Sequence, residues 1–187
     1  KKGKLIALIV NHRIRKNSKE EAKYISAYLN KNNINSQVLN VNIDKVSKKN
    51  MSEARNNRYN LLTKFCIQNN ILHLFVAHHK DDNLETFLIR KIAGSDFYGL
   101  KSMSELSVYN KVFTIRPLIN FSKEKLLDYN KKYKIEYIND PSNFNLDYTR
   151  PTIRNFLKKS DQKTIREINK DFESILFYSP YFIQMIF

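Results

Sequence analysis

Residues 71–77 read ILHLFVA, and residues 78–86 read HHKDDNLET. The first run is apolar and predicts a buried strand. The second run places two imidazoles and three carboxylates where this strand should end and a helix should begin. Because ligands bind at the carboxyl ends of the strands in open α/β sheets, residues 78–86 are predicted to form a ligand site.

Strand and helix patterns alternate along the rest of the chain. Strands are expected at residues 5–10, 38–43 and 112–115, and helices at residues 18–29, 52–65, 84–92, 122–127 and 161–177. At the start of the first of these helices, Ser18 and Glu21 are expected to form a capping box. The alternation predicts an α/β fold with a mostly parallel sheet and helices on both faces.

The chain between the fourth and fifth of these helical patterns, residues 128–160, carries several turn signals. Residues 133–138 suggest a short extended piece, and residues 140–143 are dense in turn-forming residues. Pro151 fits the first turn of a helix, so Arg150 and Arg154 are expected to project near one another. Two guanidiniums beside a tyrosine suit a phosphate or an unstacked base, and an exposed basic helix start is the alternative.

Length and composition limit the class of protein. The 187 residues suit one domain with its own core, here residues 1–157, and a helical extension over residues 158–187. No apolar run is long enough to span a bilayer, and no signal peptide is recognisable at the N-terminus. The single cysteine, Cys66, excludes a disulfide framework and a metal site built from several cysteines. We therefore expect an intracellular protein without a membrane partner.

The charge balance favours a polyanionic partner. The formal charge is +15, from 33 Lys and Arg against 18 Asp and Glu, which is typical of nucleic-acid-binding proteins. The alternative is coding bias, because Lys, Asn, Ile, Tyr and Phe are all abundant, as they are in proteins of AT-rich genomes. With three glycines in the chain, no glycine-rich phosphate loop can be built from it.

The acidic cluster at residues 81–85 has two interpretations. On a helix, Asp81 and Asp82 each lie on the same face as Glu85, at spacings of four and three residues. Like charges held together require a cation, which could be a metal ion or a ligand ammonium group. The alternative is helix capping, which explains one or two of these residues but not His78, His79 and Glu85 together.

Two basic groups lie elsewhere in the sequence. The segment from His12 to Arg15 follows the first predicted strand, where it could contact phosphate, although a solvated surface loop is the usual outcome. Arg55 and Arg58 precede Tyr59 on a predicted helix, and a solvated helix face is the default interpretation.

Five motifs in this order resemble those of the tRNA(Ile)-lysidine synthases, a family of PP-loop ATP-pyrophosphatases. The resemblance runs from about Leu5 to Leu157. It is carried by Asn11–Arg15 with Ser18, Glu21 and Ala22; by Ala54, Arg55, Arg58 and Tyr59; by residues 78–86 with Gly94, Gly99, Leu100 and Met103; by Arg116–Leu118; and by residues 140–143 with Tyr148, Thr149, Arg150, Ile153 and Arg154.

The resemblance implies a Rossmann-like, adenine-nucleotide hydrolase-like sheet and a specific ligase reaction. In the family, ATP accompanied by Mg²⁺ adenylates the C2 carbonyl oxygen of the wobble cytidine in the isoleucine tRNA with a CAU anticodon. The amine of free L-lysine then displaces AMP, and the product, lysidine, pairs with A instead of G. Decoding changes from AUG to AUA.

The resemblance also implies roles for individual residues. The catalytic group would be His78, Asp82 and Glu85; Arg58 and Asp81 would bind lysine or the adenylate; and His12, Arg15, Arg150 and Arg154 would approach tRNA or phosphate. No residue of this chain is assigned as a ligand of a resident metal.

The chain departs from the family pattern at several places. The family's Ser-Gly-Gly-x-Asp-Ser loop, which grips the ATP phosphates, precedes the segment matched by Leu5–Arg15 and is absent here. Asn11 replaces an aspartate, Arg13 a glycine and Pro151 an asparagine. The tRNA-binding C-terminal domains of longer members are also absent. We therefore expect the isolated chain to bind ATP poorly and the gene product to extend upstream.

Two other functions fit the sequence. One is a non-catalytic RNA-binding remnant of the family, and the other is a metallohydrolase built on His78, His79 and Asp82. A sulfur-inserting tRNA enzyme is disfavoured, because such enzymes typically use several cysteines. The expected compartment is the bacterial cytoplasm, with a plastid or mitochondrial interior as the alternative, and a homodimer is left as an option.

Overall fold

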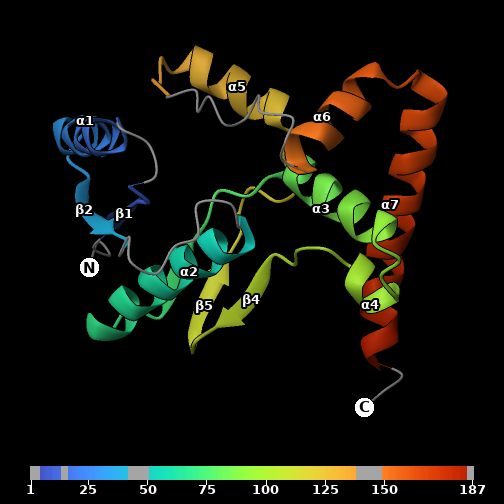
Figure 1. The fold of residues 1–187 in the computed structure, drawn as a ribbon, viewed down its shortest axis with the longest axis horizontal. Coiled ribbons are helices and arrows are strands. Elements are labelled where there is room, and N and C mark those ends of the chain that lie inside the picture. The colour runs from blue at the N-terminus through green and yellow to red at the C-terminus, as the bar shows by residue number, and fades with distance from the viewer. Residues whose placement is uncertain (1–4, 14–16, 42–50, 138–148, 185–187) are drawn as a thin grey trace. The chain divides into compact units, whose positions relative to one another are not determined.

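The computed structural model describes residues 5–13, 17–41, 51–137 and 149–184 (Figure 1). The chain divides into two compact units. The first comprises Lys1–Leu74 and Ser107–Ile115, and the second comprises Phe75–Leu106 and Arg116–Phe187. Strands and helices alternate through the first half of the chain, so the predicted α/β class is confirmed.

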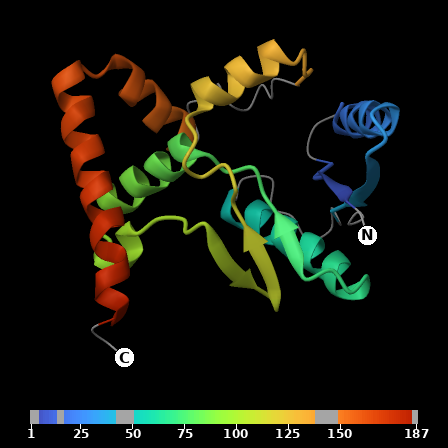
Figure 2. The same ribbon diagram turned by 180° about the vertical axis from the view of Figure 1, so that it is seen from behind.

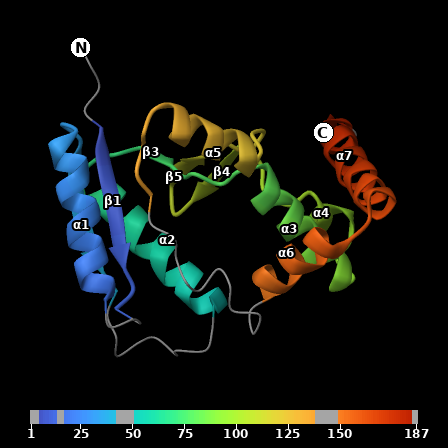
Figure 3. The ribbon, with the colours of Figure 1, turned by 90° about the horizontal axis from the view of Figure 1, so that it is seen from above.

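A parallel βαβ element begins the first unit. Strands β1 (Ile6–Asn11) and β2 (Asn35–Asn40) pair in parallel along their full lengths, and α1 (Ser18–Lys31) connects them. Helix α1 packs on both strands and α2 (Met51–Gln68) packs on β1. The two helices lie on opposite sides of β1 in Figures 1 and 3.

The start of α1 differs from the sequence prediction. Asn17 occupies the N-cap position, with its carbonyl accepting the Glu21 amide at 3.0 Å, and its side chain makes no cap hydrogen bond. The predicted Ser18–Glu21 capping box is therefore wrong, because Ser18 already lies inside the helix. The second strand also begins three residues earlier than predicted, and its predicted end at Ile43 lies outside the described residues.

A three-stranded sheet completes the first unit, in the order β3 (His73–Phe75), β5 (Val112–Ile115), β4 (Leu106–Tyr109) (Figure 2). A two-residue turn joins β4 to β5, and both turn residues, Asn110 and Lys111, have positive φ angles of 48° and 64°. These angles are typical of a type I′ hairpin, so β4 runs antiparallel to β5. Strand β4 was not predicted from the sequence.

Strand β3 is shorter and more exposed than the apolar run predicted. Leu74 is buried, whereas His73 and Phe75 on either side of it are exposed. The prediction of a buried strand over residues 71–77 is therefore wrong for all but the middle of the strand. One face of this strand packs inward, and the other face lies open.

Helices form the second unit. They are α3 (Lys80–Ile92), α4 (Phe97–Leu100), α5 (Lys123–Lys132), α6 (Thr149–Lys159) and α7 (Gln162–Gln184). Phe87 of α3 and Phe172 of α7 are both 1% exposed, with ring centroids 5.4 Å apart, and Leu88 and Ile153 complete this core. The amphipathic pattern of residues 161–177 therefore reports a helix that packs against α3.

Two predicted helix starts are confirmed. The Ser122 side chain caps α5 by accepting the Lys125 amide at 3.3 Å, and Pro151 is buried in the first turn of α6. The predicted extended piece at residues 133–138 is not a strand over 133–137, and the predicted turn at 140–143 lies outside the described residues. None of the described helices is both long and apolar enough to cross a membrane.

Candidate functional site

The N-terminus of α3 is built by the motif that opened the sequence analysis. His79 is the N-cap in extended conformation, and its Nδ1 accepts the Asp82 amide at 3.4 Å. In return, the His79 amide donates to Asp82 Oδ2 at 3.2 Å. This reciprocal pair is a capping box, so the capping interpretation is confirmed for these two residues.

Glu85 lies one turn further along α3 and is 3% exposed. Arg154 donates to its carboxylate through Nε, at 2.5 Å from Oε1, and through Nη2, at 3.2 Å from Oε2. Arg150 Nη1 donates to Oε2 at 3.0 Å. Two guanidiniums of α6 therefore neutralise one buried carboxylate. The cation that the acidic cluster requires comes, at Glu85, from the chain itself.

The same two arginines reach other residues of α3. Arg150 Nη2 donates to Thr86 Oγ1 at 2.9 Å, and Arg154 Nη2 lies 3.6 Å from Asp82 Oδ1. Burial works against the charge of Arg154, but hydrogen bonds and charge from Glu85, with the Asp82 charge, outweigh it and raise the pKa of the guanidinium. The prediction that Arg150 and Arg154 project near one another is confirmed, since both contact Glu85.

Asp81 ties the start of α3 to the start of α5. Its Oδ2 accepts the Lys123 amide at 2.7 Å and lies 3.5 Å from His79 Nδ1. The hydrogen bond from His79, helped by the Lys123 amide, lowers the pKa of Asp81 to about 2, although burial alone would raise it. Nδ1 cannot accept the Asp82 amide and donate to Asp81 at once, so these two contacts exclude each other.

The guanidiniums remain partly accessible. The side chains of Arg150 and Arg154 are 31% and 26% exposed, while the carboxylate between them is almost fully buried. Ion pairs with Glu85 fix both guanidiniums before any ligand binds. The entropy cost of ordering these side chains is therefore not added at the moment of binding. The arrangement can receive an anionic group such as a phosphate or a carboxylate.

Among the other predicted site residues, His12 and Arg58 belong to the first unit, whereas His78 belongs to the second and directly precedes the His79 cap. His12 is half-buried after β1, and burial, together with the charge of Arg58, lowers its pKa. Arg58 and Arg55 lie over the Tyr59 ring, 5.7 and 5.6 Å from its centroid. Arg15 lies outside the described residues.

Comparison with known proteins identifies the family of this chain. Residues 1–160 match the PP-loop domain. The chain belongs to the PP-loop family.

Curated relatives of this PP-loop protein include proteins named tRNA(Ile)-lysidine synthase. The chain is 41% identical over 161 residues to the tRNA(Ile)-lysidine synthase of the Wolbachia endosymbiont of Brugia malayi, covering 86% of this chain and 37% of that protein. It is 37% identical to the enzyme of that name from Orientia tsutsugamushi, covering 84% and 35%. The resemblance to lysidine synthases is confirmed, and the chain spans little more than a third of these relatives' length.

A solved structure supports the fold. The PP-loop chain matches the U34-tRNA thiolase NcsA from Methanococcus maripaludis, solved with its [4Fe-4S] cluster, with a TM-score of 0.70. The match covers 93% of this chain and 63% of the thiolase, at 20% sequence identity. At this identity the likeness shows the shared fold, and the predicted Rossmann-like class is confirmed.

Two buried polar residues of the PP-loop chain received no role from the sequence. Asn83, 4% exposed, donates to the Met103 carbonyl at 3.1 Å and accepts the Met103 amide at 2.7 Å. Arg116, 7% exposed, donates through Nη1 to the Ser104 carbonyl at 2.8 Å. Both lie within motifs that resemble those of the lysidine synthases, and this resemblance was the one sign in the sequence that they matter. Both bind the backbone of the segment that follows α4.

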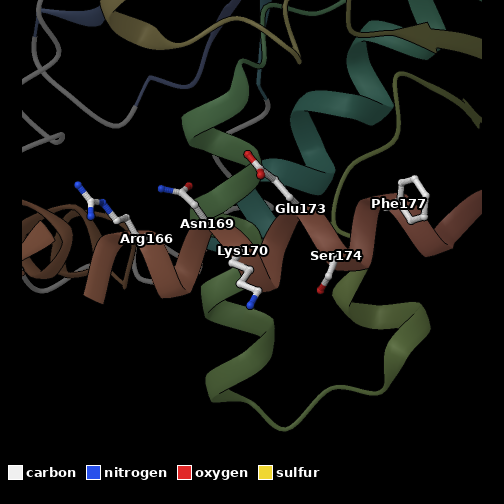
Figure 4. A pocket seen from close by; sticks show the side chains of 6 residues that line it. All are labelled: Arg166, Asn169, Lys170, Glu173, Ser174 and Phe177. Carbon is white, nitrogen blue, oxygen red and sulfur yellow. The ribbon is translucent and has the colours of Figure 1, made fainter. Parts of the chain in front are cut away.

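The described part of the PP-loop chain contains no group of three His, Cys, Asp or Glu side chains able to hold a metal ion. His79 and Asp82 instead satisfy each other as a helix cap. A hollow of about 540 Å³ lies along α7, but Figure 4 shows that its six lining residues all come from that one helix. Neither feature supports the metallohydrolase alternative.

Proposed function

We propose that this chain belongs to an enzyme that ligates L-lysine to C2 of the wobble cytidine in the CAU-anticodon isoleucine tRNA. The observation that carries the proposal is the Glu85 carboxylate held between Arg150 and Arg154, within motifs shared with proteins named tRNA(Ile)-lysidine synthase. The whole reaction includes ATP, whose AMP group activates the cytidine, and Mg²⁺, which accompanies the ATP phosphates.

The two arginines are the proposed anion contacts. Fixed by Glu85 and about a quarter to a third exposed, they are suited to hold a tRNA or nucleotide phosphate. Phosphoryl groups gain negative charge on their oxygens during adenylation and displacement. Prearranged guanidiniums stabilise that charge without reorganising during the reaction.

The acidic residues divide into two proposed roles. Glu85 acts through the arginines, because both of its oxygens already accept hydrogen bonds from them. Asp81 and Asp82 are more exposed, at 49% and 16%, and are the better contacts for the ammonium of lysine. His78 immediately precedes the cap and is proposed as catalytic with Asp82, while Glu85 completes this group as a positioning residue.

Residues of the first unit are proposed to contact the other substrates. Arg58 would orient lysine or the adenylate, and His12 and Arg15 would contact phosphate. Since burial and Arg58 lower the pKa of His12, its imidazole is neutral at pH 7 and would act as a hydrogen-bonding group. The rate enhancement in this proposal comes mainly from proximity, since three substrates must react together. We place the reaction in the bacterial cytoplasm.

Lysine transfer tests the proposal directly. The complete gene product is incubated with ATP, Mg²⁺, radiolabelled lysine and a tRNA(Ile) transcript carrying CAU. We expect label to enter this tRNA and not a transcript with U at the wobble position. Arg154→Gln should lower transfer at least about tenfold, the effect of losing a charged contact to a transition state. Lys158→Gln, one turn further along α6 and exposed, is the matched control and should not.

The RNA-binding remnant is the second candidate, favoured by the formal charge of +15. It predicts tRNA binding without any lysine transfer in the same assay. Equal lysine transfer by Arg154→Gln and Lys158→Gln would support the enzyme activity but contradict the proposed role of Arg154 in the site.

A further inference from the structure

A hollow of about 680 Å³ lies at the carboxyl ends of β1 and β2, within the first unit. Asn11 and Asn40 are the last residues of the two strands. The lining residues are Asn11, Arg13, Ser18, Lys19, Ala22, Lys23, Val38 and Asn40. A cavity of this volume at the strand ends has the size and position of a small-molecule site.

The lining has a buried floor and a cationic rim. Asn11 and Ala22 are 5% and 6% exposed, whereas Arg13, Lys19 and Lys23 are exposed. None of the eight described lining residues is acidic. The two acidic residues in the first turn of α1 are not among them. The rim therefore carries three positive charges around an uncharged floor, which suits an anion.

Arg13 is held in place by both strand ends. Its backbone N–H donates to Asn11 Oδ1 at 2.9 Å, and its Nε donates to Asn40 Oδ1 at 3.2 Å. Its φ angle is 55°, in the left-handed region that glycine adopts easily and an arginine rarely adopts. The chain thus accepts a strained backbone here and gains a guanidinium, and strain of this kind clusters at ligand sites.

We propose that this hollow binds a phosphate group and that Arg13 is its main contact. The Nε bond to Asn40 sets the plane of the guanidinium, and the terminal amino groups have no other partner among the described residues. Such a fork matches two phosphate oxygens, with Lys19 and Lys23 adding charge at the rim. The phosphate could belong to a free nucleotide or to an RNA backbone. Phosphate recognition from either source is independent of the proposed lysine transfer.

Arg13→Gly tests the proposal. Glycine tolerates the observed φ angle, so this variant should fold at least as well as the original, which thermal unfolding checks. Lys31→Gln removes one positive charge from the other end of α1, away from the hollow, and is the matched control. The probes are ATP, inorganic pyrophosphate and a fluorescein-labelled single-stranded RNA oligonucleotide, with binding followed by anisotropy and by competition.

We expect Arg13→Gly, but not Lys31→Gln, to weaken binding about three- to tenfold and to reduce the RNA salt slope by about 1. Weakening for RNA alone identifies a backbone phosphate, and weakening for ATP or pyrophosphate as well identifies a nucleotide phosphate. Equal affinities of the two variants for every probe would overturn the proposal. Because these are binding measurements, a gene product that transfers no lysine would still allow a clear result.

Discussion

The pKa of Asp81 is set by the groups around its carboxylate. It accepts hydrogen bonds at the point where the starts of α3 and α5 meet, and its pKa is lowered to about 2 by His79 and then by the Lys123 amide. A carboxyl with a lowered pKa contributes stability that is present above its ordinary pKa, 3.8, and is lost as the pH falls through its folded value.

The acid dependence of stability tests this contribution. Between about pH 4 and pH 2, urea midpoints should fall less steeply for Asp81→Asn than for the original chain, because the titrating group is gone. Asp128→Asn, at a side chain that is 68% exposed, is the control and should keep the original slope. Identical slopes for Asp81→Asn and the original chain would contradict the assignment.

Cys66 gives a second test at the scale of one residue. It is 1% exposed, and burial raises the pKa of its thiol. Since the thiolate is the reactive form, the native protein should react with Ellman's reagent far more slowly than the protein in urea. Rapid labelling of the folded protein at pH 8 would show that this part of α2 opens readily.

At the scale of elements, the Phe87–Phe172 pair lies in the core between α3 and α7. Phe172→Ala removes a side chain packed on Phe87 and should cost about 3–5 kcal/mol of unfolding free energy. Phe177→Ala, on the same helix but 64% exposed, is the matched control and should change stability by less than about 0.5 kcal/mol. Denaturant unfolding measures both, and equal costs would mean that α7 does not pack as described.

Ion pairs from Glu85 of α3 to Arg150 and Arg154 of α6 join these two helices, and we call this contact the clamp. Glu85→Gln leaves Arg150 and Arg154 without their shared carboxylate and should destabilise the protein by about 2 kcal/mol. This is less than a fully buried pair costs, because both guanidiniums reach solvent. Glu167→Gln, at an exposed position of α7, should be near neutral. An equal loss in the two variants by urea unfolding would argue against the clamp.

At the scale of the whole molecule, the excess of cations predicts a strong salt dependence. Because the formal charge is +15, the affinity for RNA should fall by at least about tenfold between 50 and 200 mM salt. Binding releases counterions from the RNA, and this release is less favourable at higher salt. Anisotropy titrations of a labelled RNA across this range measure the slope. A constant affinity over this range would mean that the positive charge reflects coding bias and not RNA binding.

Local patterns in the sequence were enough for most of the elements. Apolar runs and helical spacing predicted β1, β5, α1, α2, α3, α5 and α7, because these periods reflect a single strand or helix and its nearest neighbours. The four-residue spacing of Arg150 and Arg154 predicted their proximity for the same reason. The family motifs predicted the PP-loop class, since they lie in order along most of the chain.

Long-range packing decided the rest. Glu85 meets Arg150 and Arg154 across 65 and 69 residues, and no local pattern states which cation will neutralise a buried acid. The same holds for the open face of β3 and for the β4–β5 hairpin, whose turn residues, Asn110 and Lys111, lack the glycine that normally signals it. The sequence by itself determined most of the elements and the family. The tertiary structure decided which charges meet, because desolvation and pairing depend on neighbours brought together by folding.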